Sequence, residues 1–406
     1  MGVGRGRPPR PDDTARPTPG PPTGLWFRPP RLRTVDAEQE RRHATWLELF
    51  FDLVFVVAIA ELGHQLVVDH SLFGFLRFAG LFIPVFVAWQ GFMAYADRFD
   101  TDDFAFRLAV FCAMLAIAAM AVLIGDVAQD RNTTPFVLAY VTIRCLMLAL
   151  YARAWFAVPA ARPLIRFYGL GYTLGVAIWL SSLAISPPFR YVIWGIALTE
   201  ELSLPPLTTR LHERIRTSAS HLPERWALFT LIVIGESVVA VALETAGARW
   251  HAASAAAAVL GFAGVVGAWW LYFDRQADVV LTGSTTSVVI YSYAHIPLLI
   301  GLAGMSAGVR MLIEHASDPH LGLEPTAALL GGVILYLLAL MATRAVTVSD
   351  AHGRGRQLKL AAIAVLVGLL LAQGGLSPLV PAAGVALVLG ALIYAERVAI
   401  GYAPLA

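Results

Sequence analysis

Acidic residues of this chain lie inside stretches that are otherwise apolar, and Glu236 is the plainest case. Residues 228–243 contain no basic residue, and Glu236 is followed directly by Ser237. A carboxylate at the centre of a bilayer costs about 2.5–3.5 kcal/mol on insertion scales, and such a group normally faces protein or water. We therefore predict that Glu236, with Ser237 beside it, binds a proton or a cation. The alternative is a structural glutamate that is protonated or paired.

A second group of acids lies in the apolar stretch 46–66. Glu48 and Asp52 are four residues apart, which puts them on one face of a helix, one turn from each other. Two neighbouring carboxylates can share a proton or hold a small cation. Glu61 and His64 are predicted to form a second pair nearer the outer end of the helix. The alternatives are that Glu48 caps the helix and that His64 is a hydrogen-bonded histidine at the membrane boundary.

Four further polar residues fall in predicted spans, namely Arg144, Glu200, Glu201 and His295. Arg144 is the natural counter-ion for one of the carboxylates, and that pairing is either functional or purely structural. His295 precedes Pro297 by two residues. Because proline donates no backbone hydrogen bond and strains the turn, the helix is expected to kink there. A broken helix of this kind would line a cavity.

Neither a metal centre nor a disulfide framework is predicted. The spacing of Glu61 and His64 occurs in carboxylate-bridged di-metal sites, but those sites need two such motifs and two more glutamates. Only one copy falls within a predicted span. Cys112 and Cys145 both fall inside predicted spans, which fits neither disulfides nor a thiolate metal site. The prediction is therefore no metal and no cofactor.

The composition places these residues in a membrane protein. Of the 406 residues, 58% are hydrophobic and 14% are charged, and the mean hydropathy is +0.67, which excludes a water-soluble globule. Apolar runs of about 20 residues can span a bilayer, and they predict an all-α polytopic bundle of about twelve transmembrane helices. The predicted cores are residues 46–66, 72–95, 104–124, 136–158, 165–185, 191–207, 226–243, 252–273, 288–311, 327–348, 358–373 and 379–400.

Charge and composition also predict the organisation of the chain. Residues 1–40 are rich in Pro and Arg and are predicted to be a disordered cytoplasmic tail, followed by six-helix halves at 41–218 and 219–406. The tail lacks the apolar core of a signal peptide. Basic residues gather in the tail, the even-numbered connections and the C-terminal segment, so both termini are expected in the cytoplasm. The net charge of +2 does not indicate nucleic acid; the expected partner is membrane lipid.

The two halves carry similar motifs. Trp46-Leu-Glu-Leu-Phe opens the first predicted span, and Trp226-Ala-Leu-Phe opens the seventh. Tyr-Ala-Asp97-Arg closes the second span, and Tyr-Phe-Asp274-Arg closes the eighth. Six spans per half would give both copies the same orientation, as in transporters with parallel repeats. The alternative is that aromatic residues and charges simply recur at helix ends.

These motifs resemble a known family. Leu47-Glu-Leu-Phe-Phe-Asp-Leu-Val-Phe-Val-Val-Ala-Ile-Ala, Gly235-Glu-Ser and Tyr291-Ser-Tyr-Ala-His-Ile-Pro are similar to the bacterial low temperature requirement A family, from about residue 41 to about residue 401. The resemblance implies a multi-pass protein of the bacterial inner membrane, in a family named for growth in the cold, and it supplies no substrate. It points to Glu48, Asp52, Gly235, Glu236, Ser237, His295 and Pro297.

Three classes of function fit these observations. The favoured prediction is a proton- or cation-coupled transporter or channel, in which Asp52 and Glu236 face a shared, partly hydrated cavity with His295 on its wall. An intramembrane enzyme would use the same groups as general acid and base on a lipid-borne substrate. A regulatory or structural protein of cold adaptation needs no such chemistry. No Gly-x-Ser-x-Gly motif, Walker loop or sizeable extramembrane domain is evident, which favours transport over an enzyme. The sequence identifies neither the ion or small-molecule ligand nor the oligomeric state.

Overall fold

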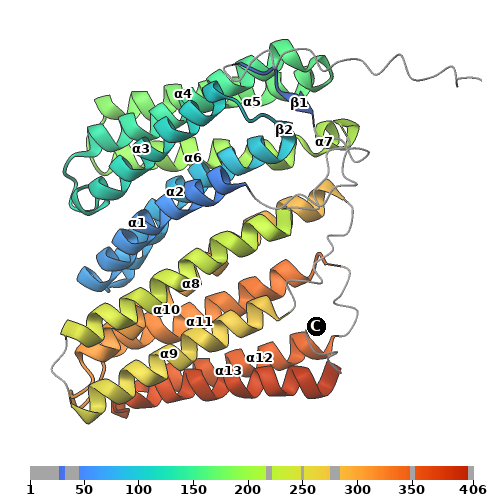
Figure 1. Cartoon of the computed structure of the whole chain (residues 1–406). Coiled ribbons are helices and arrows are strands. Elements are labelled where there is room, and N and C mark those ends of the chain that lie inside the picture. The colour runs from blue at the N-terminus through green and yellow to red at the C-terminus, as the bar shows by residue number, and fades with distance from the viewer. Residues whose placement is uncertain are drawn as a thin grey trace, which may run out of the picture.

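The computed structural model describes residues 27–32, 45–215, 222–247, 251–274, 284–347 and 353–400. These residues form long helices, short 3-10 turns and one pair of two-residue strands (Figure 1). The helices are α1 (Trp46–Val68), α2 (Leu72–Arg98), α3 (Phe104–Ala128), α4 (Thr133–Ala157), α5 (Arg162–Ser181), α6 (Phe189–Leu207), α7 (Thr209–Ile215), α8 (Leu222–Gly247), α9 (Ala252–Phe273), α10 (Thr285–Glu314), α11 (Leu323–Arg344), α12 (Arg354–Leu371) and α13 (Leu379–Ile400). The strands are β1 (Arg31–Leu32) and β2 (Phe99–Asp100), and the 3-10 turns are η2 (Pro159–Ala161), η3 (Ser182–Ala184) and η4 (Gln373–Gly375).

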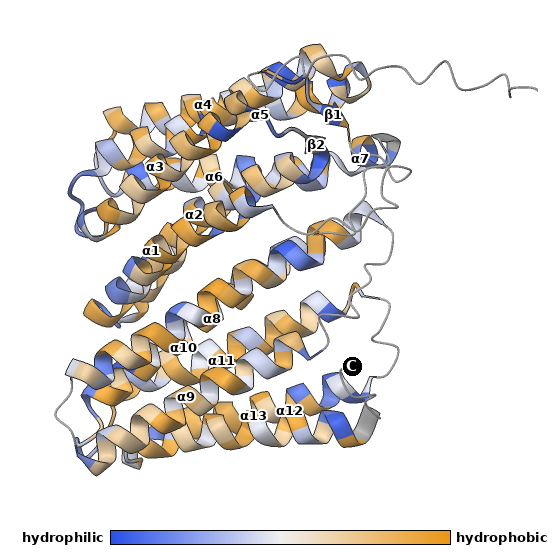
Figure 2. Cartoon of the chain, viewed as in Figure 1, coloured by the Kyte–Doolittle hydropathy of each residue, from blue (hydrophilic) through white to orange (hydrophobic). Residues whose placement is uncertain are grey.

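The long helices have the composition of membrane spans. Within the described residues, nine of them are long and apolar enough to cross a bilayer, namely α2, α3, α4, α5 with its flanking turns, α8, α9, α10, α11 and α13. Hydrophobic residues cover most of the length of the helices (Figure 2). The prediction of an all-α, multi-pass membrane protein is thereby confirmed. Helices α1, α6 and α12 also coincide with predicted spans, and each of them carries charged residues.

Helix α10 lies at the centre of the bundle. In α10, 83% of the most apolar 18-residue window is buried, against 33–56% in the other eight candidate spans. The helix packs against α1, α8, α9 and α11. A polar group that faces α10 therefore faces protein rather than lipid.

Helices α10 and α11 pack backbone against backbone. A Cβ atom added at Gly308 would lie 2.4 Å from the backbone nitrogen of Leu329, and one at Gly332 would lie 2.4 Å from the backbone nitrogen of Met305. Only glycine permits so close an approach at these two positions. Helix α10 also continues through Pro297 as one helix, and the kink expected at this proline stays a prediction.

Part of the N-terminal segment is structured. Strand β1 pairs antiparallel with β2, and the backbone N–H of Arg28 donates to Asp103 Oδ2 at 2.6 Å. Arg153 forms an ion pair with the same carboxylate. Backbone pairing and charge thus hold residues 27–32, a segment that has little apolar surface to bury, and the disordered tail stays a prediction. The remainder of the predicted tail lies outside the described residues.

Candidate functional site

Asp52 is fully buried on α1, where this helix faces α2 and α8. The helix begins with a capping box, in which Thr45 Oγ1 accepts from the backbone N–H of Glu48 and the Glu48 carboxylate accepts from the N–H of Thr45. One turn later, Asp52 Oδ1 accepts from Trp89 Nε1 at 2.7 Å and from Arg225 Nη2 at 3.0 Å. The cap anticipated for Glu48 is therefore observed, and Asp52 belongs to an ion pair between α1 and α8.

Arg225 changes the interpretation of the two acids. Its Nη1 lies 3.6 Å from Glu48 Oε2, so one guanidinium interacts with both carboxylates, in place of the predicted pair that shares a proton or a cation. Two carboxylates against one guanidinium leave one negative charge in excess. Among the described residues, Asp52 Oδ2 and Arg225 Nη1 are buried without a hydrogen-bond partner. The sequence does not indicate this partner, because Arg225 lies at the start of an apolar run, 173 positions from Asp52.

His295 of α10 ends a row of packed aromatic rings. The ring centroids of Trp89 and Trp226 are 4.7 Å apart, and those of Trp226 and His295 are 4.5 Å apart. His295 Nδ1 lies 2.7 Å from the carbonyl oxygen of Tyr291, and Nε2 lies 3.0 Å from the hydroxyl of Tyr272. Because a carbonyl only accepts, we assign the proton to Nδ1, and Nε2 accepts from Tyr272. Both nitrogens of a neutral imidazole are thus occupied.

Glu236 lies in the middle of α8 and faces α10. Its residue is 6% exposed, and Ser306 Oγ donates to Glu236 Oε2 at 3.4 Å. Among the described residues, no cation lies within ion-pair distance of this carboxylate. The nearby Arg310 instead donates to Glu244 Oε1 at 3.0 Å, two helical turns further along α8. Glu236 is therefore the buried acid with the weakest compensation for a negative charge.

Two further features of α8 concern the predicted site, namely the hydrogen bond of Ser237 and the distance between Glu236 and Arg225. Ser237 Oγ donates to the carbonyl oxygen of Val233 at 3.2 Å, so its hydroxyl is occupied within its own helix. Glu236 lies eleven residues after Arg225, the partner of Asp52, which is about 16 Å along a helix axis. The two acids thus have separate partners at different depths, and a hydrated connection between them stays a prediction.

Arg144 has the predicted role of counter-ion. Its Nη2 lies 2.7 Å from Glu201 Oε2, and both side chains are fully buried. Tyr140 links them, since its hydroxyl donates to Glu201 at 2.6 Å and accepts from Arg144 at 2.6 Å. The adjacent Glu200 is half-buried, and its Oε2 has no hydrogen-bond partner among the described residues. This cluster, which lies between α4, α5 and α6, repeats the balance of one arginine against two carboxylates.

The predicted second pair on α1 is not formed. Glu61 Oε1 accepts from Gln65 Nε2 at 2.7 Å, whereas His64 is exposed on another face of the helix. The contact with Gln65 was not predicted, although helical spacing places both Gln65 and His64 beside Glu61. Cys112 and Cys145 are both free and exposed.

Comparison with known proteins gives the identity of the fold just described. Residues 43–394 match the family described as bacterial low temperature requirement A protein (LtrA). The chain belongs to the LtrA family. It is also 29% identical over 339 residues to the uncharacterized protein RA0937 of Rhizobium meliloti (strain 1021), across 76% of this chain and 78% of that protein. The match to LtrA excludes residues 27–32 and includes every buried acid described above.

The LtrA chain thus holds two clusters that each contain one arginine and two carboxylates. Glu48, Asp52 and Arg225 form one cluster, and Arg144, Glu200 and Glu201 form the other. Each cluster has one negative charge in excess of its arginine. Such a charge in a low-dielectric setting is relieved by taking up a proton or a cation.

Proposed function

We propose that this LtrA protein is a proton- or cation-coupled transporter or channel of the bacterial inner membrane. The observation that carries the proposal is Glu236, which is 6% exposed and whose one hydrogen bond among the described residues comes from Ser306 at 3.4 Å. An unpaired charge in such a place is costly, so the carboxylate holds a proton or a cation. Release and uptake of that ion would be the coupling step.

The ion pair between Asp52 and Arg225 would link this step to movement. Helix α1 belongs to the first half of the chain and α8 to the second, and both pack against α10. The bond between Asp52 and Arg225 is therefore a contact between the halves. Protonation of Asp52 would remove one charge of that pair and weaken the contact, which would allow α1 to move relative to α8.

The neighbours of each helix support twelve crossings in two related halves. In the first half, α1 packs against α2 and α3, α3 against α4, α4 against α5, and α5 against α6. In the second half, α8 packs against α9 and α10, α10 against α11, α11 against α12, and α12 against α13. The order is the same, with α7 as the connection. Twelve crossings would put both termini on the same side of the membrane. The arginine distribution favours the cytoplasm as that side.

A flux assay tests the proposed function. The full chain is reconstituted in liposomes, and uptake of a panel of monovalent cations and amines is measured at two pH values against protein-free liposomes. We expect flux of at least one ion above the protein-free rate, with a rate that depends on pH. Absence of protein-dependent flux for protons and for every member of the panel would contradict the proposal.

A further inference from the structure

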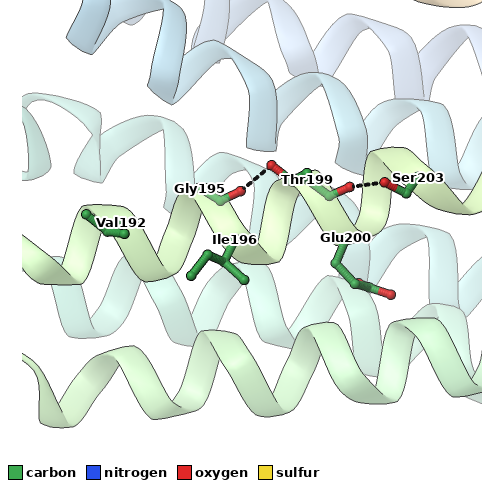
Figure 3. A pocket seen from close by; sticks show the side chains of 6 residues that line it. All are labelled: Val192, Gly195, Ile196, Thr199, Glu200 and Ser203. Carbon is green, nitrogen blue, oxygen red and sulfur yellow. Dashed lines mark hydrogen bonds between the residues drawn. The ribbon is translucent and has the colours of Figure 1, made fainter.

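Helix α6 carries a groove of about 610 Å³ that is lined by Val192, Gly195, Ile196, Thr199, Glu200 and Ser203. Figure 3 shows Ile196 and Glu200 extending from the same side of the helix. The lining is open on the outer surface of the bundle, where Val192 is 57% exposed and Ile196 is 51% exposed. All six lining residues belong to α6, so the groove is an open site on the surface of the bundle.

Glu200 supplies the chemistry of this groove. The Thr199 hydroxyl donates to the carbonyl oxygen of Gly195 at 2.7 Å, and the Ser203 hydroxyl donates to that of Thr199 at 2.6 Å (Figure 3). Both hydroxyl protons are thus used within α6. The groove therefore presents apolar walls and one carboxylate.

The charge of Glu200 is not balanced by the residues behind it. Arg144 is engaged by Glu201 at 2.7 Å, so one guanidinium serves two acids. Within the described residues, Glu200 Oε2, Glu201 Oε1 and Arg144 Nη1 are all buried and have no hydrogen-bond partner. The cluster therefore lacks one positive charge, and Glu200 is the member of the cluster that lines the groove.

Helix α5 packs closely against these oxygens. A Cβ atom added at Gly175 would lie 3.1 Å from Glu201 Oε1 and 3.3 Å from Glu200 Oε2. The absence of a side chain at Gly175 thus allows both carboxylates to lie against α5.

We propose that the α6 groove binds an organic monocation from the lipid side, with its charged centre at Glu200 and its apolar body against Val192 and Ile196. The excess of one negative charge calls for one positive charge, and the apolar walls call for a lipophilic body. A polyvalent metal ion is the weaker candidate, because no group of three His, Cys, Asp or Glu residues that could hold one occurs within the described residues. The binding step does not depend on whether Glu236 carries ions.

The test compares two probes of equal shape and opposite charge. Binding of tetraphenylphosphonium and of tetraphenylborate to the full chain in lipid nanodiscs is measured by equilibrium dialysis, with empty nanodiscs subtracted. We expect saturable binding of the phosphonium that weakens as the pH is lowered, because protons compete for the same carboxylate. The borate should bind at least tenfold more weakly.

Three variants locate the site. Glu200→Gln should weaken phosphonium binding at least tenfold, and Gly175→Ala should weaken it because the added methyl group displaces the Glu200 and Glu201 carboxylates. Thr142→Ala on α4 is the control outside the groove, because it removes an exposed hydroxyl that likewise donates within its own helix, and it should bind as the wild type does. Elution as a monodisperse protein is checked for each variant, and Glu200→Asp replaces Glu200→Gln if the latter does not fold. Equal binding of both probes, no phosphonium binding, or binding that survives in the folded Glu200 and Gly175 variants would overturn the proposal.

Discussion

Replacing Arg225 with methionine tests whether the ion pair between α1 and α8 holds the structure together. Arg225 is 7% exposed and lies 3.0 Å from Asp52 and 3.6 Å from Glu48. Methionine fills a similar length with an apolar chain, so the main change is the loss of the cation. Removing one partner of a buried pair costs about 3–5 kcal/mol. We expect about 4 kcal/mol for Arg225→Met, because the fully buried Asp52 loses its only ion-pair partner among the described residues.

Asp52→Asn should cost less than Arg225→Met. Asparagine keeps an acceptor for Trp89, and Arg225 retains Glu48 at 3.6 Å, so we expect about 2 kcal/mol. In the double variant, no buried guanidinium is left without its partner. Its loss should therefore be smaller than the sum of the two single losses by about 2 kcal/mol.

The free energies of unfolding come from titration of mixed micelles with dodecyl sulfate, followed by tryptophan fluorescence. Additive losses in the double variant, or a loss below about 1 kcal/mol for Arg225→Met, would refute the reasoning from buried charge. If Asp52 served only to bind a proton or a cation, neutralising it would leave folding intact. The ion pair with Arg225 reverses that expectation for Asp52, and it leaves the expectation unchanged for Glu236.

Three further predictions concern packing, pH and topology. Gly308→Ala should lower stability by about 1–3 kcal/mol through overpacking against α11, whereas Gly331→Ala, which has open space around its Cβ position, should be neutral in the same titration. Burial and the neighbouring Arg98 guanidinium lower the pKa of His212, in α7 at the end of the bundle, to about 3. Because the unfolded chain takes up this proton near pH 6.5, the free energy of unfolding should decrease as the pH falls below 6.5. His212→Gln should lose this part of the pH dependence of the melting temperature. Reporters fused to either terminus should give cytoplasmic signals and one placed in residues 248–250 an external signal; opposite signals at the two termini would contradict twelve crossings.

Local features of the structure were predictable from the sequence. Apolar runs predicted the helices, because the length of a bilayer-spanning run is set by the bilayer. The cap at Glu48 follows from residues three positions apart, and Arg144 was recognised as a counter-ion because it was a cation inside a span. Which carboxylate pairs with Arg144 could not be predicted, since Glu201 is 57 positions away in another helix.

Contacts between distant helices were not predictable in this way. Arg225 resembles an ordinary arginine at the cytoplasmic end of a helix, and only the packing of α1 on α8 brings it to Asp52. Hydropathy likewise does not show that Trp89 packs between Asp52 and Trp226. The pairing of Glu61 with Gln65 depended on the choice between two side chains near one acid, and the spacing alone permitted both.

We propose that Glu236 carries the coupled proton or cation. Proton or cation flux in proteoliposomes measures whether transport depends on this carboxylate. Wild-type protein, Glu236→Gln and the exposed-acid control Glu314→Gln are reconstituted at equal density, and each variant is first shown to unfold at the wild-type dodecyl sulfate concentration. We expect flux for the wild type and for Glu314→Gln, and a flux at least tenfold lower for Glu236→Gln. Wild-type flux through correctly folded Glu236→Gln would contradict it.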